Sequence, residues 1–174
     1  MYGNLTTIVG PMYGGKTSEI LKRVLWAKNG LGKNVRVFKP AMDNRYSENE
    51  IVSHDGLTIA AESITVIPTE ISSEMVVFDE IQFFEASVVD FIKLNLQYGN
   101  DVIVAGLDMD SNGNAFELSA ILMAMADEVI KKTANCTICG RNATKTYRKT
   151  DSSNIIELGG NDKYEARCNQ HWSS

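Results

Sequence analysis

Short apolar segments recur along the chain and alternate with helical patterns or polar loops. Strands that alternate with helices are typical of a parallel sheet with helices on its faces. The segments that we predict to be buried strands are residues 5–9, 35–38, 75–78, 102–105 and 129–130. We therefore predict an α/β fold built on a parallel sheet.

Two helical patterns accompany these strands. The first follows residue 17, and the apolar positions that fall on one of its faces are Ile20, Leu21, Val24 and Leu25. The second has i, i+3, i+4, i+7 spacing and consists of Leu118, Ile121, Leu122 and Met125. We interpret the second stripe as part of the core rather than as a cofactor site.

A glycine-rich loop joins the first predicted strand to the first predicted helix. It has the form G-x-x-x-x-G-K-T and consists of Gly10, Pro11, Met12, Tyr13, Gly14, Gly15, Lys16 and Thr17. Glycines let backbone N–H groups approach phosphate oxygens, and a helix N-terminus adds unpaired donors and partial positive charge. We expect Lys16 to reach the outer phosphates of the ligand and the Thr17 hydroxyl to hold Mg²⁺. Together with the sheet, this loop predicts a RecA-like P-loop domain.

Two carboxylates, Asp79 and Glu80, directly follow the predicted strand at 75–78. Ligands of open α/β sheets bind beyond the carboxyl ends of the strands, so both acids are expected to reach that crevice. We predict that Asp79 holds Mg²⁺, usually through water, and that Glu80 takes a proton from an attacking hydroxyl or water. The alternative is a strand that ends in solvated acids. Phe83 and Phe84 either wall a pocket for a flat base or join the core, and we expect at least one in the core.

Two polar loops follow other strands. Residues 43–50 are weakly patterned, and two interpretations stay open: a loop near the nucleotide with Arg45 as a phosphate ligand, or a solvated surface loop. Residues 106–114 follow the strand at 102–105, at the carboxyl end where substrate contacts belong. We expect His54 at a turn or a strand edge and assign it no role.

The composition changes at Thr133, and two metal-binding patterns follow. A C-x-x-C pair and a C-x-x-H pair use all three cysteines of the chain, and the four residues are Cys136, Cys139, Cys168 and His171. Such pairs are typical of a zinc ribbon, and four protein ligands leave no open position, so we predict structural Zn²⁺. The alternative is free thiols beside a surface histidine. A loop anchored by metal at both ends is able to fold over a ligand.

Length and charge narrow the function classes. A chain of 174 residues suggests one domain, or one domain with a small appendage. A formal net charge of −5 argues against a sequence-independent grip on DNA or RNA, which needs clustered basic charge. No apolar run is long enough to cross a bilayer and no secretory signal is visible, so we expect a cytoplasmic protein with no membrane partner.

Four motifs resemble those of the type II thymidine kinases, the cellular and bacterial class with a zinc-bound lasso. The loop form Gly10-Pro11-Met12-Tyr13 is one, and the run Lys39-Pro40-Ala41-Met42-Asp43-Asn44-Arg45-Tyr46-Ser47 matches the family's flexible loop. The other two are Asp79-Glu80-Ile81-Gln82-Phe83-Phe84 and Gly159-Gly160-Asn161-Asp162-Lys163-Tyr164. The resemblance extends over nearly the whole chain.

The resemblance implies ATP-dependent phosphorylation of the thymidine 5′-hydroxyl in deoxynucleoside salvage, with Glu80 as the general base. It implies that ATP and its phosphates contact the glycine loop and also Asp43, Asn44, Arg45, Asp79 and Gln82. For thymidine it implies contacts with Met12, Phe83, Leu107, Ser111, Phe116 and Tyr164, and with the lasso residues Ile155, Ile156, Glu157, Leu158 and Gly159.

The resemblance also implies a homotetramer, feedback inhibition by dTTP, and a division into a kinase domain (1–132) and a zinc-binding lasso domain (133–174). The chain departs from the family pattern at Ser111, where an aromatic is usual, at Ala115, where proline is usual, and at Glu157, where the lasso is commonly apolar. Those departures concern the sugar and base contacts more than the type of reaction.

Two other functions compete with the kinase. In an ATPase motor or switch, Glu80 would activate water and the zinc ribbon would bind nucleic acid, but the net charge of −5 and the lack of a basic stripe weigh against it. A non-catalytic zinc-ribbon module on an inactive nucleotide fold is opposed by the intact Lys16, Thr17, Asp79 and Glu80.

Overall fold

The computed structural model describes residues 1–42, 49–53, 56–149 and 162–172. At the centre of this part lies a six-stranded sheet in the order β5-β2-β6-β7-β1-β8, and each neighbouring pair is parallel. Its strands are β1 (Leu5–Val9), β2 (Val35–Pro40), β5 (Glu62–Ile64), β6 (Met75–Phe78), β7 (Asp101–Gly106) and β8 (Glu128–Lys131). All five predicted strands are therefore confirmed, as is the parallel sheet.

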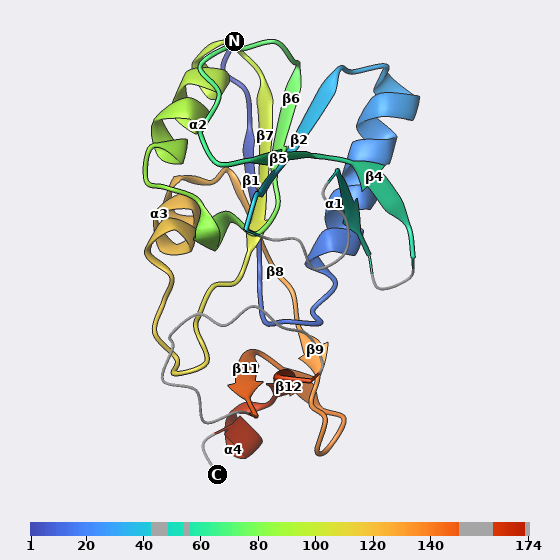
Figure 1. The fold of residues 1–174 in the computed structure, drawn as a ribbon, viewed down its shortest axis with the longest axis vertical. Helices are drawn as coiled ribbons and strands as arrows, with labels where there is room; N and C mark the ends of the chain where they lie inside the picture. The colour runs from blue at the N-terminus through green and yellow to red at the C-terminus, as the bar shows by residue number, and fades with distance from the viewer. Residues whose placement is uncertain (43–48, 54–55, 150–161, 173–174) are drawn as a thin grey trace.

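Helices cover both faces of this sheet (Figure 1). They are α1 (Lys16–Leu25) on one face, and α2 (Val88–Gln97) and α3 (Glu117–Met125) on the other. Side chains of the central strands alternate between the two resulting cores. On β6, Met75 and Val77 pack on the α1 side, whereas Val76 and Phe78 pack on the α2 side. Burial on both faces explains why these strands are continuous apolar runs rather than alternating ones.

Two helical positions predicted from the sequence are wrong in detail. Leu25 is 40% exposed, because α1 continues into the π-helix η1 (Trp26–Gly30) and buries Ala27 instead. Ile121 is 39% exposed, whereas Leu122, next to it, is fully buried against the sheet. The other three positions of each predicted stripe contact the core, and they are Ile20, Leu21 and Val24 in α1 and Leu118, Leu122 and Met125 in α3.

Three elements on the α1 side and at the sheet edge were not predicted. A hairpin formed by β3 (Glu50–Val52) and β4 (Thr58–Ala60) inserts Ile51 and Ile59 into the core beside α1. The edge strand β5 pairs with Lys39 and Pro40, so β2 extends beyond its predicted end. These strands are three residues each and largely exposed, which leaves little hydrophobic pattern to detect.

A small module lies beyond the carboxyl ends of the sheet strands (Figure 1). We use the name C-terminal module for residues 134–149 and 162–172. It contains β9 (Ala134–Asn135), β10 (Asn142–Ala143), β11 (Lys145–Arg148), β12 (Tyr164–Arg167) and the short helix α4 (Asn169–Trp172). β9 pairs with β10 and β11 with β12, both antiparallel.

In the part of the chain that the structure describes, no helix combines the length and the apolar character that a bilayer-spanning segment requires.

Candidate functional site

The glycine-rich loop lies between β1 and α1, as predicted. Gly15 is the N-cap of α1 with φ of 75°, and no side chain among the described residues caps this helix. An uncapped helix N-terminus presents backbone N–H groups and partial positive charge to an anion. Tyr13 also has a positive φ, of 65°, which shows that the loop bends sharply before the helix begins.

Lys16 and Thr17 point into this loop region from the first turn of α1. The Lys16 side chain is buried, and its Nζ donates to the Pro11 carbonyl at 2.8 Å, so the ammonium lies along the loop. The Thr17 hydroxyl donates to Asp79 Oδ2 at 3.4 Å, across from the end of β6. A hydroxyl and a carboxylate oxygen are hard ligands of the kind that Mg²⁺ accepts. The predicted magnesium residues are therefore adjacent and chemically suited to the ion.

Glu80 turns the chain away from the end of β6. Its φ is 54°, an uncommon value for a residue with a side chain, and its N–H donates to Asp79 Oδ1 at 3.0 Å. Its carbonyl accepts the Phe83 N–H at 3.0 Å, which starts the 3₁₀ turn η2 (Ile81–Phe83). Asp79 is buried and Glu80 is partly exposed. The strained turn thus keeps Asp79 near Thr17 while Glu80 retains access to a ligand.

Gln82 connects the predicted base to the neighbouring strand. Its Nε2 donates to Glu80 Oε2 at 2.6 Å, and its Oε1 accepts the Leu107 N–H at 3.0 Å. A Cβ at Gly106 would overlap the Gln82 side-chain oxygen, so only glycine fits at the end of β7. The family resemblance implies a phosphate contact for Gln82, but in this structure its amide holds Glu80 and Leu107 together.

Residues 107–116, which we call the 107–116 loop, carry three of the predicted thymidine contacts. Leu107, Ser111 and Phe116 are each partly buried. Asp110 closes the loop on itself, because its Oδ1 accepts the N–H groups of Asn112 and Asn114, both at 2.9 Å. The loop is therefore a compact turn that begins at the carboxyl end of β7 and ends at the start of α3.

Asp108, which lies in the same loop, is a second buried carboxylate near the site. Lys131 Nζ, at the end of β8, lies 2.9 Å from its Oδ2. The backbone carbonyl of Asp108 accepts the Phe116 N–H at 3.0 Å. These contacts give Asp108 a role in fixing the loop to β8.

The adjacent aromatics after Glu80 have different surroundings. Phe84 packs edge-on against the buried Phe78, with ring centroids 5.3 Å apart. Phe83 is partly buried in η2. The expectation that at least one of the pair belongs to the core is met by Phe84, and Phe83 stays a candidate contact for the base.

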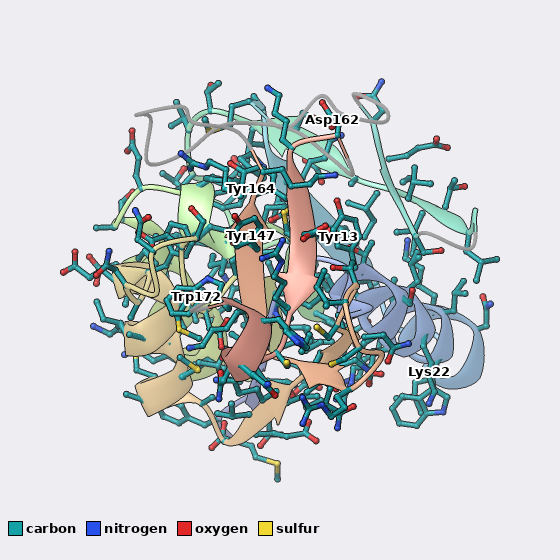
Figure 2. The ribbon with its side chains drawn as sticks, turned by 90° about the horizontal axis from the view of Figure 1, so that it is seen from below. Tyr13, Lys22, Tyr147, Asp162, Tyr164 and Trp172 are labelled. Carbon is teal, nitrogen blue, oxygen red and sulfur yellow. The ribbon has the colours of Figure 1, made fainter. Side chains whose placement is uncertain are left out.

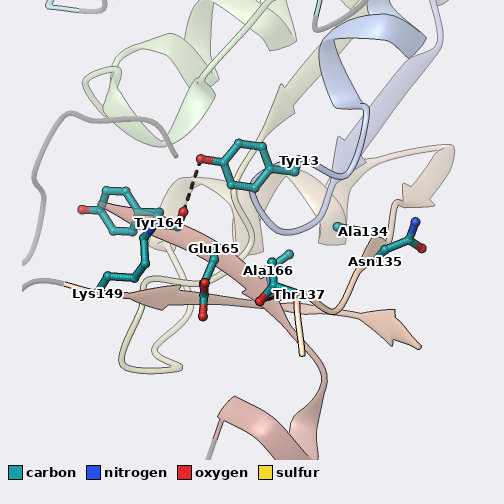
Figure 3. A pocket seen from close by; sticks show the side chains of 8 residues that line it. All are labelled: Tyr13, Ala134, Asn135, Thr137, Lys149, Tyr164, Glu165 and Ala166. Atoms are coloured by element: carbon teal, nitrogen blue, oxygen red, sulfur yellow. Dashed lines mark hydrogen bonds between the residues drawn. The ribbon is translucent and has the colours of Figure 1, made fainter. Parts of the chain in front are cut away.

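The C-terminal module touches the phosphate loop directly. The Met12 N–H donates to Thr146 Oγ1 at 3.1 Å, and the Tyr13 hydroxyl donates to the Tyr164 carbonyl at 3.4 Å (Figure 3). A pocket of about 460 Å³ opens beside this second contact, and its lining residues are Tyr13, Ala134, Asn135, Thr137, Lys149, Tyr164, Glu165 and Ala166. Tyr164, a predicted thymidine contact, is buried, and its hydrogen bond with Tyr13 places it beside the phosphate loop.

The four predicted zinc ligands are brought together, with their ligand atoms within 4.8 Å of one another. Cys139 Sγ lies 3.9 Å from Cys168 Sγ, and His171 Nδ1 lies 3.4 Å from Cys168 Sγ and 3.6 Å from Cys136 Sγ. Tetrahedral Zn²⁺ with Zn–S of about 2.3 Å and Zn–N of about 2.0 Å places sulfur pairs about 3.8 Å apart and sulfur–nitrogen pairs about 3.5 Å apart. The geometry of this cluster therefore fits four-coordinate zinc.

The surroundings of the cysteines favour the thiolate form that zinc requires. Arg141 Nε donates to Cys139 Sγ at 3.4 Å, and this contact lowers the pKa of the Cys139 thiol. For Cys136, burial raises the pKa, but the backbone N–H groups of Cys168, Ile138 and Cys139 outweigh burial and lower it to about 5. Thiolates are metal ligands, so the cluster is prepared for a cation.

Several residues singled out from the sequence lie outside the described part of the structure. They are Asp43, Asn44, Arg45 and His54, together with the lasso residues Ile155, Ile156, Glu157, Leu158 and Gly159. Their proposed contacts stay predictions.

Sequence reasoning missed three residues that contact the site. Thr146 accepts from the phosphate loop, Trp172 donates its indole N–H to the Ser111 carbonyl at 3.2 Å, and Lys132 donates its backbone N–H to Val9 at 2.7 Å. Lys132 was detectable, because it follows a predicted strand at the carboxyl edge of the sheet. Thr146 and Trp172 carry no local signal, since their contacts depend on how the module folds back onto the sheet.

Comparisons with known proteins show the family of the chain. A sequence model of the family described as thymidine kinase matches residues 3–172. A thymidine kinase of Thermococcus kodakarensis is 39% identical in an alignment 188 positions long, which covers 97% of this chain and 93% of the relative. A thymidine kinase of Pseudothermotoga lettingae is 40% identical in an alignment 176 positions long, which covers 97% of this chain and 94% of the relative. By both measures, this chain belongs to the thymidine kinase family.

Proposed function

We propose that this chain transfers the γ-phosphoryl group of ATP to the 5′-hydroxyl of thymidine. The observation that supports this most directly is the meeting of Lys16, Thr17, Asp79 and Glu80 at one edge of the sheet, joined by the Thr17–Asp79 hydrogen bond. Phosphoryl transfer depends mainly on positioning and charge stabilisation, and these residues supply both. Family membership supplies the nucleoside as the acceptor.

In the proposed reaction, the loop amides, the α1 N-terminus and Lys16 hold the phosphates. Thr17 and Asp79 would hold Mg²⁺, which would supply positive charge beside the transferring group. Glu80 accepts the proton of the 5′-hydroxyl while the hydroxyl oxygen forms a bond to the γ-phosphorus. The bond between that phosphorus and the leaving ADP oxygen breaks. Gln82 keeps the Glu80 carboxylate in place through the 2.6 Å hydrogen bond.

The C-terminal module is proposed to be a zinc-binding lasso domain that begins near residue 133 and holds the base of thymidine. Its contacts to Met12 and Tyr13 support this position. From the family resemblance we also propose a cytoplasmic homotetramer that is inhibited by dTTP. Size-exclusion chromatography with light scattering, and inhibition assays with dTTP, test those two points.

The experiment is to incubate the protein with ATP, Mg²⁺ and a panel of nucleosides, and to follow ADP release. Release that depends on thymidine supports the proposal, whereas release with water alone or with added DNA points to an ATPase motor. Lys16→Ala is expected to abolish most turnover while preserving the fold. Lys22→Ala is the matched control, because this exposed lysine lies on the same helix but away from the site (Figure 2).

A further inference from the structure

Trp172 lies one residue after the predicted zinc ligand His171 and rests on the tip of the 107–116 loop (Figure 2). Its indole Nε1 donates to the Ser111 carbonyl at 3.2 Å. Its ring lies so close to Gly113 that a Cβ there would come within 2.8 Å of it. The contact is therefore both a directed hydrogen bond and close packing against backbone.

A second residue of the module reinforces this contact. Lys145, on β11, places its Nζ 5.3 Å from the centroid of the Trp172 ring and 3.3 Å from Met109 Sδ. The next residue along β11, Thr146, accepts the Met12 N–H. Successive residues of a strand point to opposite sides, so β11 reaches the 107–116 loop with one side chain and the phosphate loop with the next.

The zinc ligands determine where Trp172 lies. The backbone N–H of Trp172 donates to the Cys168 carbonyl at 3.0 Å. The His171 carbonyl accepts from Arg167 Nη1, also at 3.0 Å. α4 has only four residues, too few to hold its own shape without outside support. Ordering of Cys168 and His171 by a metal therefore also orders the indole.

We propose that Trp172 is a positioning residue that fastens the 107–116 loop to the zinc-binding module. The loop carries Leu107, Ser111 and Phe116, so a metal held by the module would support nucleoside binding through this contact. The expected effect on the thymidine KM rests on the proposed function, whereas the contact between Trp172 and the loop does not. Trp172 acts on thymidine affinity through the loop, not on the chemical step.

The kinetic test compares the two tryptophans of the chain. Trp172→Phe keeps a ring but removes the N–H donor, and we expect the thymidine KM to rise about fivefold, the effect of one lost hydrogen bond. The values of kcat and of the ATP KM should stay near those of the wild type. Trp26→Phe is the control, because Trp26 is 64% exposed on η1. An unchanged thymidine KM, or an equal loss for both substrates, would overturn the proposal.

A spectroscopic test needs no turnover. In a Trp26→Phe background, Trp172 is the remaining tryptophan, and its emission reports on the contact. Asp110→Ala opens the 107–116 loop, so we expect a red-shifted Trp172 emission at unchanged zinc content and melting temperature. Asp90→Ala, which alters an exposed carboxylate on α2, should leave the emission unchanged.

The two tests separate the contact from the activity. If Asp110→Ala leaves the wavelength of the Trp172 emission unchanged, the contact between Trp172 and the 107–116 loop is refuted, whichever substrate the enzyme phosphorylates. A shifted emission in a protein that phosphorylates no nucleoside refutes the proposed function but leaves the contact standing.

Discussion

The central sheet and the C-terminal module are held together in different ways. The sheet buries large side chains in two extensive cores, with Ile20 in one and Phe38 and Phe78 in the other. In the described part of the module, the hydrophobic cluster consists of small side chains, and Tyr164 is a larger buried residue that lies outside this cluster. The members of the cluster are Ala134, Cys136, Ala143, Ala166 and Cys168. Apolar burial contributes about 25 cal/mol per Å², so a core of this kind stabilises little by itself. The sheet thus has a large core of its own, whereas the module has a small one and is proposed to rely on zinc and on its contacts with the sheet.

The two regions also contribute different parts of the proposed reaction. The sheet edge supplies the phosphate loop, Asp79 and Glu80, which act on the transferring group. The module supplies Tyr164 and, through Trp172, a support for the 107–116 loop. If this division is correct, changes at the sheet edge lower kcat, and changes in the module raise the thymidine KM.

The largest effect is expected at the sheet edge, from Glu80→Gln. The amide preserves size and shape but does not accept the hydroxyl proton, so kcat should fall about 10²-fold or more, the range for a lost general base. ATP affinity should change little, because Lys16, Thr17 and Asp79 hold the phosphates and the metal. Steady-state kinetics with thymidine and calorimetry with ATP measure the two quantities.

Asp79→Asn is the comparison for Glu80→Gln. Because Asp79 is a proposed Mg²⁺ ligand, this variant should weaken the dependence of activity on Mg²⁺. A Glu80→Gln enzyme that keeps more than about a tenth of the wild-type kcat would show that Glu80 is not the base. The proton acceptor would then have to be sought elsewhere, first at Asp43 and at the buried Asp108, whose Oδ2 lies 2.9 Å from Lys131 Nζ.

In the module, Cys139→Ser is expected to release the metal and raise the thymidine KM more than the ATP KM. Serine is a poor zinc ligand, and a site with three good ligands holds zinc less tightly than one with four. Elemental analysis should fall from about one zinc per chain to well below one. Because the sheet has its own core, its thermal unfolding should remain cooperative. A fully active, metal-free wild-type preparation would contradict this dependence.

The same contrast explains what the sequence predicted well. The central strands are buried on both faces, so their apolar runs are strong signals, and the loop after residue 9 carries a fixed spacing of glycines, lysine and threonine. The cysteine and histidine pairs were equally visible, because zinc imposes short spacings within each pair. These features are encoded locally, and the fold and the cluster at the metal site were predicted from them.

What was missed depends on contacts between distant segments. β5 is a short edge strand without an apolar pattern, and the exposure of Leu25 depends on the π-helical turn that follows it. The hydrogen bonds of Gln82 to Glu80 and Leu107 were also missed, because they form only when β6 and β7 lie side by side, and the phosphate contact that the resemblance implies for Gln82 stays a prediction. Spacing within one segment carries no information on such contacts.

A smaller effect at the sheet edge is expected from Gln82→Met. Methionine fills a similar volume but removes the donor to Glu80 and the acceptor for Leu107, so kcat should fall about tenfold, in line with a hydrogen bond to a charged group. The ATP KM should stay near the wild-type value. A selective rise in the ATP KM would instead support the phosphate contact that the resemblance implies. Gln97→Met, at the exposed end of α2, is the matched control.

The smallest effect tests where the division between the regions breaks down. Thr146 belongs to the module, yet its Oγ1 accepts the Met12 N–H of the phosphate loop at 3.1 Å. Thr146→Val preserves the shape of this buried side chain but leaves the amide without that acceptor. We expect the ATP KM to rise about fivefold, the effect of one lost hydrogen bond, with a smaller change in the thymidine KM.

Thr58→Val is the control for this variant, because Thr58 is an exposed threonine on β4. It should leave both KM values unchanged. If Thr146→Val raises only the thymidine KM, the module serves the nucleoside alone and the division is complete. If it raises the ATP KM, β11 also holds the phosphate loop, and loss of zinc should then weaken ATP binding to a measurable but lesser degree than thymidine binding.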